Sequence, residues 1–209
     1  MASVAISDLI DLDQRSLYVS ALSIMFNPLF WNIVARQEYR NKILTRLFGG
    51  HSQLACYFLA ATIFSLGLVR DYLYKAALAD QPTHPLLDTD AVKYVSYALF
   101  ITGNIFVITS TWALGITGTF LGDYFGILMD DIVTGFPFNI SGAPMYHGST
   151  MSFLGAALYF AKPAGILLTG WVYLIYAIAL SYEDPFTAEI YAKRDRERAA
   201  AKKRSKKAQ

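Results

Sequence analysis

Two adjacent carboxylates, Glu183 and Asp184, stand where a long uncharged run near the C-terminal end of the chain stops. A carboxylate at the boundary of an apolar helix is costly to bury, so it is either solvated at the helix end or kept there for a function. The pair alone does not decide between these alternatives. A fixed negative charge at such a place would suit a cationic substrate or cofactor.

The segment 123–149 contains the other residues whose types suit chemistry. It is uncharged from Ile132 onward but rich in glycine and proline, so it cannot form a single lipid-facing helix. Irregular backbone at membrane depth is tolerated where it lines a cavity or is buried in protein, and we therefore expect a binding site here. His147 is a candidate general base because histidine gains and loses a proton near neutral pH. A purely structural histidine is the alternative.

The elements that must position these residues are membrane helices. The 209-residue chain is 55% hydrophobic and 16% charged, whereas a soluble domain carries about a quarter charged residues. About 20 apolar residues cross a hydrocarbon core of about 30 Å. Uncharged intervals of that order cover 16–35, 52–69, 94–122, 132–161 and 163–182. The composition predicts an all-α, polytopic integral membrane protein.

The apolar pattern predicts four hydrophobic helical segments and a fifth, short half-helix. The four segments are 16–35, 52–69, 92–122 and 164–180. Asn27-Pro28 interrupts the first, which leaves open whether it spans the membrane or lies at its surface. The half-helix at 150–161 is too short to cross, and Lys162-Pro163 separates it from the last segment. These two elements are expected to form a helical hairpin.

The distribution of charges does not decide on which side of the membrane some of the loops lie. The basic segment 36–46 and the basic C-terminal tail both favour the cytoplasmic side, which requires 150–182 to be a returning hairpin. If 150–161 belonged to an interfacial loop instead, the segment 123–160 would be lumenal.

Four glycines at helical spacing mark the end of the third hydrophobic segment: Gly115, Gly118, Gly122 and Gly126. Small residues on one face of a membrane helix allow a second helix backbone to approach closely. We expect them to form a helix-packing face, with direct contact to a ligand as the alternative.

The segment 192–209 is a basic tail, with nine Lys or Arg residues against two acidic ones. A polybasic segment beside a membrane helix stays cytoplasmic. No aromatic or folded element accompanies these charges, so nucleic acid is not an expected partner. We expect a membrane-embedded domain at 1–191 and a disordered cytoplasmic tail at 192–209. Lys206-Lys207 matches the dilysine signal of endoplasmic-reticulum membrane proteins, which predicts a coat-type retrieval receptor as a partner.

The most specific sequence pattern lies in six stretches of the chain. They are residues 26–32, 54–57, 113–128, 136–140, 144–149 and 182–191. Together they closely resemble the phosphatidylethanolamine N-methyltransferases of the endoplasmic reticulum, over nearly the whole chain. The resemblance implies that S-adenosylmethionine methylates phosphatidylethanolamine and its mono- and dimethyl derivatives to phosphatidylcholine, with no metal. It implies a phospholipid substrate in the bilayer of the endoplasmic reticulum, with the mitochondria-associated membrane as a second location.

The first motif that the resemblance carries over is a cofactor-binding Gly-x-Gly in the third apolar segment. It falls on Ile101, Thr102 and Gly103, so only Gly103 matches. The resemblance implies that these three residues bind S-adenosylmethionine. Because Ile101 replaces the first glycine, helix packing is the alternative role of this stretch.

The second motif is the family's acidic pair, which falls on Glu183 and Asp184, with Asp in place of the usual second Glu. The charge is kept and the reach is shorter by one methylene. The wider family of membrane methyltransferases has a Pro-x-Tyr-x-Gly pattern near the cofactor, here Pro144, Tyr146 and Gly148. The resemblance therefore adds the acidic pair, Pro144 and Gly148 to the expected cofactor-binding residues.

The expected reaction is a displacement at carbon, so the protein mainly orients the reactants and places charge. We expect Glu183 to hold the methionine amino group or to offset the sulfonium charge, with Asp184 assisting. His147 and Tyr146 are the catalytic candidates. Aromatic faces stabilise alkylammonium groups, and the candidates are Tyr124, Phe136, Tyr146 and Tyr182. The alternative class is a non-enzymatic transporter or scaffold subunit, although no inverted repeat is evident.

Overall fold

The computed structural model describes residues 6–207 of the chain, with side chains from 8 to 205, and its regular elements in that range are all helical. They are α1 (Ile6–Leu9), α2 (Arg15–Asn41), α3 (Ile43–Leu47), α4 (Ser52–Asp80), α5 (Asp90–Thr119), η1 (Gly122–Phe125), α6 (Pro144–Tyr159) and α7 (Pro163–Lys207). Four helical stretches of the described chain are long and apolar enough to cross a membrane. The prediction of an all-α, polytopic membrane protein is confirmed.

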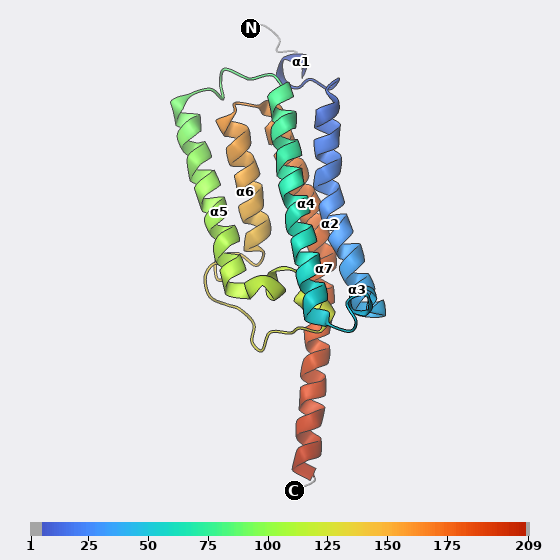
Figure 1. The fold of residues 1–209 in the computed structure, drawn as a ribbon. Coiled ribbons are helices and arrows are strands. Elements are labelled where there is room, and N and C mark those ends of the chain that lie inside the picture. The colour runs from blue at the N-terminus through green and yellow to red at the C-terminus, as the bar shows by residue number, and fades with distance from the viewer. Residues whose placement is uncertain (1–5, 208–209) are drawn as a thin grey trace.

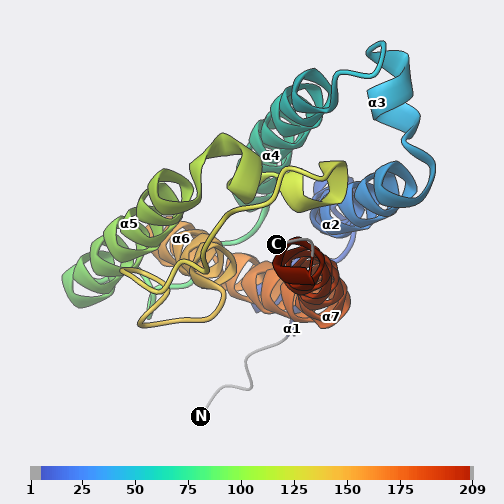
Figure 2. The same cartoon turned by 90° about the horizontal axis from the view of Figure 1, so that it is seen from below.

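The long helices form a bundle in which consecutive helices run antiparallel to each other (Figure 1). α2 packs against α4, and α5 packs against α6. α7 contacts both α6 and α2, so it joins the two pairs, as the view along the bundle shows (Figure 2). Beyond the bundle, α7 projects alone toward the C-terminal end.

The first hydrophobic segment forms a continuous helix. α2 has 27 residues and runs through Pro28, which gives it a length of about 40 Å. The Pro28 carbonyl oxygen accepts a hydrogen bond from Asn32 Nδ2 at 3.0 Å. The sequence left open whether 16–35 spans the membrane, and α2 is long and apolar enough to do so.

The expected helical hairpin is formed by α6 and α7, but α6 is longer than the predicted half-helix at 150–161. It begins at Pro144. A proline is tolerated there because the backbone N–H that it lacks would have no partner within the first turn of a helix. Its 16 residues extend about 24 Å, slightly less than the membrane core. Ala161 has a positive φ of 53°, and α7 starts two residues later. α6 and α7 pack against each other.

Glycines of α5 and α6 allow these two helices to approach each other closely. A Cβ atom on Gly103 would clash with the Gly148 carbonyl oxygen, and a Cβ on Gly148 would lie 2.5 Å from the Gly103 carbonyl oxygen. About two turns further along α6, a Cβ on Gly155 would lie 2.9 Å from the Ser96 carbonyl oxygen. Only residues without a side chain fit at these crossings, so the glycines set the position of α6.

The predicted packing face of Gly115, Gly118, Gly122 and Gly126 is wrong. α5 kinks at Gly115, which has φ 65° and ψ 178°, and the helix ends at Thr119. Gly126 also has a positive φ, of 82°, and no heavy atom lies within 4 Å of a Cβ placed on it or on Gly115. The four glycines therefore do not lie on one continuous helix. Gly115 and Gly126 instead allow the backbone to turn with a positive φ.

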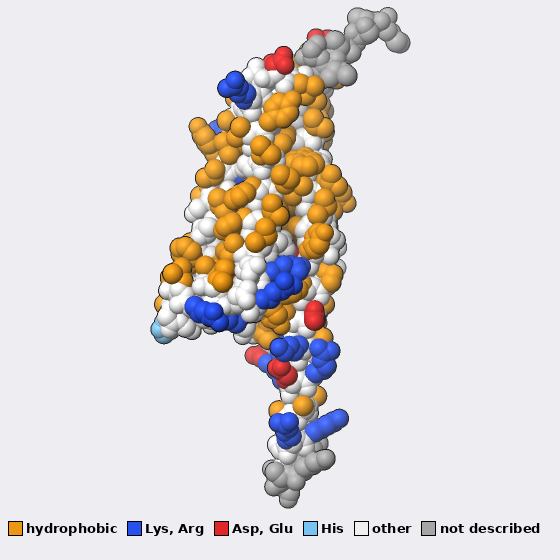
Figure 3. Space-filling view, turned by 90° about the vertical axis from the view of Figure 1, so that its right-hand side faces the viewer, with side chains coloured by type: hydrophobic (Ala, Val, Ile, Leu, Met, Phe, Trp, Pro, Cys, Tyr) orange, Lys and Arg blue, Asp and Glu red, His pale blue; other side chains and the backbone are white. Residues whose placement is uncertain are grey.

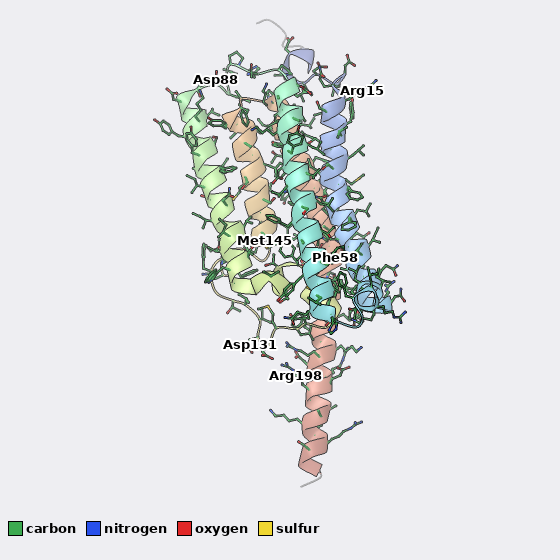
Figure 4. The ribbon with its side chains drawn as sticks, in the orientation of Figure 1. Arg15, Phe58, Asp88, Asp131, Met145 and Arg198 are labelled. Carbon is green, nitrogen blue, oxygen red and sulfur yellow. The ribbon has the colours of Figure 1, made fainter. Side chains whose placement is uncertain are left out.

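The charged side chains are unevenly distributed over the bundle. Hydrophobic side chains cover most of the face shown in Figure 3, and Lys and Arg side chains gather at its lower end and on the extension of α7. Asp131 and Arg198 lie at this end, whereas Arg15 and Asp88 lie at the other (Figure 4). The basic segment 36–46 and the tail are thus on the same side of the bundle.

The expected disordered tail differs from the structure, in which α7 continues as a helix to Lys207. Alanine, lysine and arginine, which dominate this stretch, have high helix propensity. Arg198 pairs with Asp130 at 2.9 Å, and Arg194 donates to the Met129 carbonyl oxygen. The domain boundary at 191/192 stays a prediction. The predicted retrieval signal at Lys206-Lys207 lies outside the residues whose side chains are described.

Candidate active site

Glu183 is held at the meeting point of three helices. Its Oε1 atom accepts hydrogen bonds from Trp31 Nε1 and Asn32 Nδ2, both at 2.7 Å. Its Oε2 atom accepts a hydrogen bond from the Tyr146 hydroxyl at 2.5 Å. Trp31 and Asn32 come from α2, Tyr146 from α6 and Glu183 from α7. A carboxylate is costly to remove from water unless it is hydrogen-bonded, and three donors meet that requirement here.

The helix geometry explains why Glu183 lies at this place. It is 20 residues after the start of α7 at Pro163, or about 30 Å along the helix, at the edge of the apolar part of the bundle. Asp184, the next residue, is exposed. Successive residues of a helix point about 100° apart, so only one carboxylate of the predicted pair enters the bundle.

A guanidinium group of α2 contacts the residue that precedes Glu183 in α7. Arg36 Nη2 donates to the Tyr182 carbonyl oxygen at 2.7 Å, and the Arg36 guanidinium lies 4.4 Å from the centre of the Phe186 ring. Arg36 is half-buried. The site therefore presents a carboxylate and a cation from neighbouring turns of α2 and α7.

A polar path continues from Tyr146 into the interior of the bundle. The rings of Tyr146 and Tyr176 pack edge to face, with centroids 4.9 Å apart. The Tyr176 hydroxyl accepts a hydrogen bond from Arg70 Nη1 at 2.6 Å and lies 3.2 Å from Ser149 Oγ. Arg70 also pairs with Asp71 at 2.8 Å. A charge inside an apolar helix indicates a functional site, and this signal in α4 was available from the sequence.

A cavity of about 240 Å³ lies between α6 and α7. Its walls are formed by Tyr146, His147, Thr150, Tyr173, Tyr176, Ala177 and Leu180. Both catalytic candidates, Tyr146 and His147, therefore border the same space. His147 Nδ1 lies 2.6 Å from Ser141 Oγ, so this nitrogen is engaged and Nε2 is the ring nitrogen left for a ligand.

A second hollow lies at the turn between α3 and α4 and has a volume of about 350 Å³. It is lined by Gly50, His51, Ser52, Gln53, Leu54 and Tyr57. None of the predicted site residues borders it. It is larger than the cavity between α6 and α7, but it lacks the chemistry that the sequence singled out.

The predicted Gly-x-Gly residues do not join the hydrogen-bond shell of Glu183. Ile101 is 58% exposed on the outside of α5, Thr102 is half-buried, and Gly103 faces Gly148. In this structure the two glycines hold α6, and with it Tyr146, in place. A direct contact of these residues with a cofactor stays a prediction.

Pro144 is buried and starts α6. It therefore lies two residues before Tyr146, close to the site along the chain.

Sequence reasoning missed Trp31 and Asn32 as partners of Glu183, although both lie in the matched stretch 26–32. A tryptophan followed by an asparagine inside an apolar helix was a usable signal, because buried polar groups need partners. Among the described residues, no group of three or more His, Cys, Asp or Glu side chains is placed to hold a metal ion.

The fold and the site are those of an integral membrane protein in which a hydrogen-bonded carboxylate lies beside a cavity lined by aromatic residues. Residues 92–194 match the family model described as phospholipid methyltransferase. The chain is 66% identical to the phosphatidyl-N-methylethanolamine N-methyltransferase of Neurospora crassa, over 99% of this chain and 98% of that protein. It is 55% identical to the protein of the same name in Saccharomyces cerevisiae, over 90% of each.

The human phosphatidylethanolamine N-methyltransferase is 49% identical, over 84% of this chain and 88% of that protein. No solved structure matches the chain. With relatives this similar along almost its whole length, the chain belongs to the phospholipid methyltransferase family.

Proposed function

We propose that the protein is an enzyme that transfers methyl groups from S-adenosylmethionine to the amine of phosphatidylethanolamine and of its mono- and dimethyl derivatives, ending at phosphatidylcholine. The observation that carries this proposal is the Glu183 carboxylate, held by three donors beside the cavity of Tyr146 and His147. The names of the relatives support the substrate class.

The residues around Glu183 fit the methionine part of the cofactor. S-adenosylmethionine supplies an activated methyl group on a sulfonium, and it also carries an ammonium and a carboxylate. Asn32 Oδ1 is a buried acceptor that no described residue satisfies, and it lies on the side chain that donates to Glu183. Glu183 and Asn32 together suit an ammonium donor, and Arg36 suits a carboxylate. Asp184 adds negative charge at the exposed edge.

The cavity between α6 and α7 fits the lipid amine. An ammonium headgroup must lose a proton before its nitrogen can form a bond to carbon. If His147 donates its Nδ1 hydrogen to Ser141 Oγ, Nε2 keeps a lone pair and accepts that proton. Tyr146 borders the cavity and donates a hydrogen bond to Glu183. It therefore connects the cavity proposed for the lipid amine with the carboxylate proposed for the cofactor.

The positions of the basic residues support a proposed orientation in the membrane. We infer that the end with the segment 36–46 and the tail is cytoplasmic, because basic segments stay on that side of a membrane. The proposed membrane is that of the endoplasmic reticulum, as the resemblance implies. A coat-type retrieval receptor is the proposed partner of the tail. Protease treatment of sealed microsomes tests the orientation: a C-terminal epitope should be lost without detergent, and a protected epitope would reverse it.

The activity is tested with purified protein in bilayers that contain one acceptor at a time. Radiolabelled S-adenosylmethionine should transfer label to phosphatidylethanolamine or to its mono- or dimethyl form, and the three rates show which steps the enzyme performs. If no lipid acquires label, the proposal fails and a transporter or scaffold role replaces it.

A further inference from the structure

Three tyrosines form most of the polar wall of the cavity between α6 and α7. They are Tyr146 from α6 and Tyr173 and Tyr176 from α7. Tyr173 and Tyr176 are one helical turn apart, so their side chains lie on the same face of α7. Tyr176 and Tyr146 meet edge to face across the helix pair. The sequence suggested Tyr124, Phe136 and Tyr182 as aromatic contacts, and none of them lines this cavity.

Two of the three rings are fixed by partly buried hydrogen bonds. Tyr176 is 5% exposed, and its hydroxyl bonds with Arg70 at 2.6 Å and Ser149 at 3.2 Å. The Tyr146 hydroxyl bonds with Glu183. Rings held in this way present a preorganised surface, because little freedom is lost when a ligand binds.

The charges around the cavity favour a cation. Glu183 bonds directly to a wall residue, Tyr146, and brings a negative charge to that side. Arg70 lies against Tyr176, but its charge is compensated by Asp71 at 2.8 Å. A cation is attracted both by the carboxylate and by the faces of tyrosine rings.

The size and the opening of the cavity suit a headgroup. Its volume of about 240 Å³ is below the roughly 300–1,000 Å³ of pockets for drug-sized ligands, so it holds a headgroup and not a whole lipid. Tyr173 is 57% exposed, which places it at the mouth on the outer surface of the bundle. A lipid can therefore keep its acyl chains in the bilayer while its headgroup enters.

We propose that this cavity is an aromatic site for the alkylammonium headgroup of the lipid, with Tyr146, Tyr173 and Tyr176 as its walls. The identity of the lipid rests on the proposed function; the cation preference rests on the cavity. Each methyl group that is added to the headgroup nitrogen removes an N–H donor and adds apolar surface. Water solvates this apolar surface poorly, whereas the faces of aromatic rings bind it well. The site therefore binds the headgroup more tightly as methylation proceeds, and it keeps partly methylated lipids for the next step.

The test is saturation-transfer NMR on the full chain in detergent micelles, with phosphocholine as the probe and phosphoethanolamine as its unmethylated counterpart. Saturating aromatic protons should transfer signal to the N-methyl protons of phosphocholine. Tyr173→Leu should weaken phosphocholine binding roughly 2- to 5-fold, the size of one cation–π contact. Tyr173→Phe keeps the ring face and should bind as the unchanged protein does.

Tyr94→Leu is the matched control. Tyr94 is a tyrosine of α5 that is 73% exposed and does not line the cavity, so this variant should bind phosphocholine normally. Equal binding of phosphocholine by Tyr173→Leu and the unchanged protein would overturn the proposal. So would tighter binding of phosphoethanolamine than of phosphocholine.

Failure of this proposal and failure of the proposed function give different results. In the methylation assay, Tyr173→Leu should raise KM for the dimethyl lipid more than for phosphatidylethanolamine and leave kcat nearly unchanged. An active enzyme whose KM values do not respond to Tyr173→Leu would overturn the headgroup site alone. A protein that binds phosphocholine at this cavity but labels no lipid would support the site and contradict the methyltransferase.

Discussion

The Tyr146 hydroxyl donates a 2.5 Å hydrogen bond to Glu183 Oε2, and the same tyrosine lines the cavity that contains His147. One side chain thus connects the carboxylate that α2 and α7 hold with the space between α6 and α7. Tyr146 lies in the first turn of α6, so a shift of α6 relative to α7 would disturb both parts of the site together.

Gly103→Ala should destabilise the protein by about 1–3 kcal/mol, as other overpacked interiors are, because its Cβ would meet the Gly148 carbonyl oxygen. Thermal unfolding in detergent measures the loss, and methylation should fall because Tyr146 moves with α6. Ile101→Ala is the control, since Ile101 is 58% exposed. A Gly103→Ala protein of normal stability that no longer binds cofactor would assign this glycine to the cofactor instead.

Trp31→Phe removes one donor to Glu183 and keeps an aromatic ring in α2. A lost hydrogen bond to a charged group costs about 1.5–3 kcal/mol, but two donors remain. We expect S-adenosylmethionine to bind about tenfold more weakly, measured by calorimetry. Trp171→Phe loses a 3.0 Å hydrogen bond to the Ala21 carbonyl oxygen, away from the site, and should bind normally. Equal effects of the two substitutions would contradict a specific role for Trp31.

Shortening the tail should have an effect that depends on where it ends. Ending the chain after Arg198 keeps the contacts of Arg194 and Arg198 with residues 129–130, so the rate of label transfer should stay near that of the full chain. Ending it after Tyr191 removes both contacts and should lower the rate by loosening the loop before α6. Equal rates for the two truncations would place the boundary of the active domain at 191.

The membrane bundle was predictable because its signal is compositional: long uncharged intervals and the Lys162-Pro163 break locate the long helices and the hairpin. The start of α6 at Pro144 was not predicted, because proline and glycine in 135–148 indicate a loop and proline at a helix start is a local exception. The prediction of a packing face at the glycines of 115–126 was wrong for a related reason. It assumed that one regular helix continues past Gly115.

The candidate site was predicted in part. Glu183, Tyr146 and His147 were singled out from their types and from the resemblance, and the structure brings them together. The partners Trp31 and Asn32 are about 150 positions from Glu183 in the chain and no local pattern connects them. Such contacts depend on how α2 packs against α7, which sequence periodicity does not specify.

The central claim is that Glu183 anchors the methyl donor, and calorimetric titration of S-adenosylmethionine into Glu183→Gln tests it most directly. Glutamine keeps the shape and can still accept from Trp31 and Asn32, so the unfolding temperature should change little. Loss of the charge should weaken binding at least about tenfold, whereas Asp184→Asn, at an exposed position, should bind within about threefold of the unchanged protein. A well-folded Glu183→Gln protein with unaltered affinity would contradict the claim.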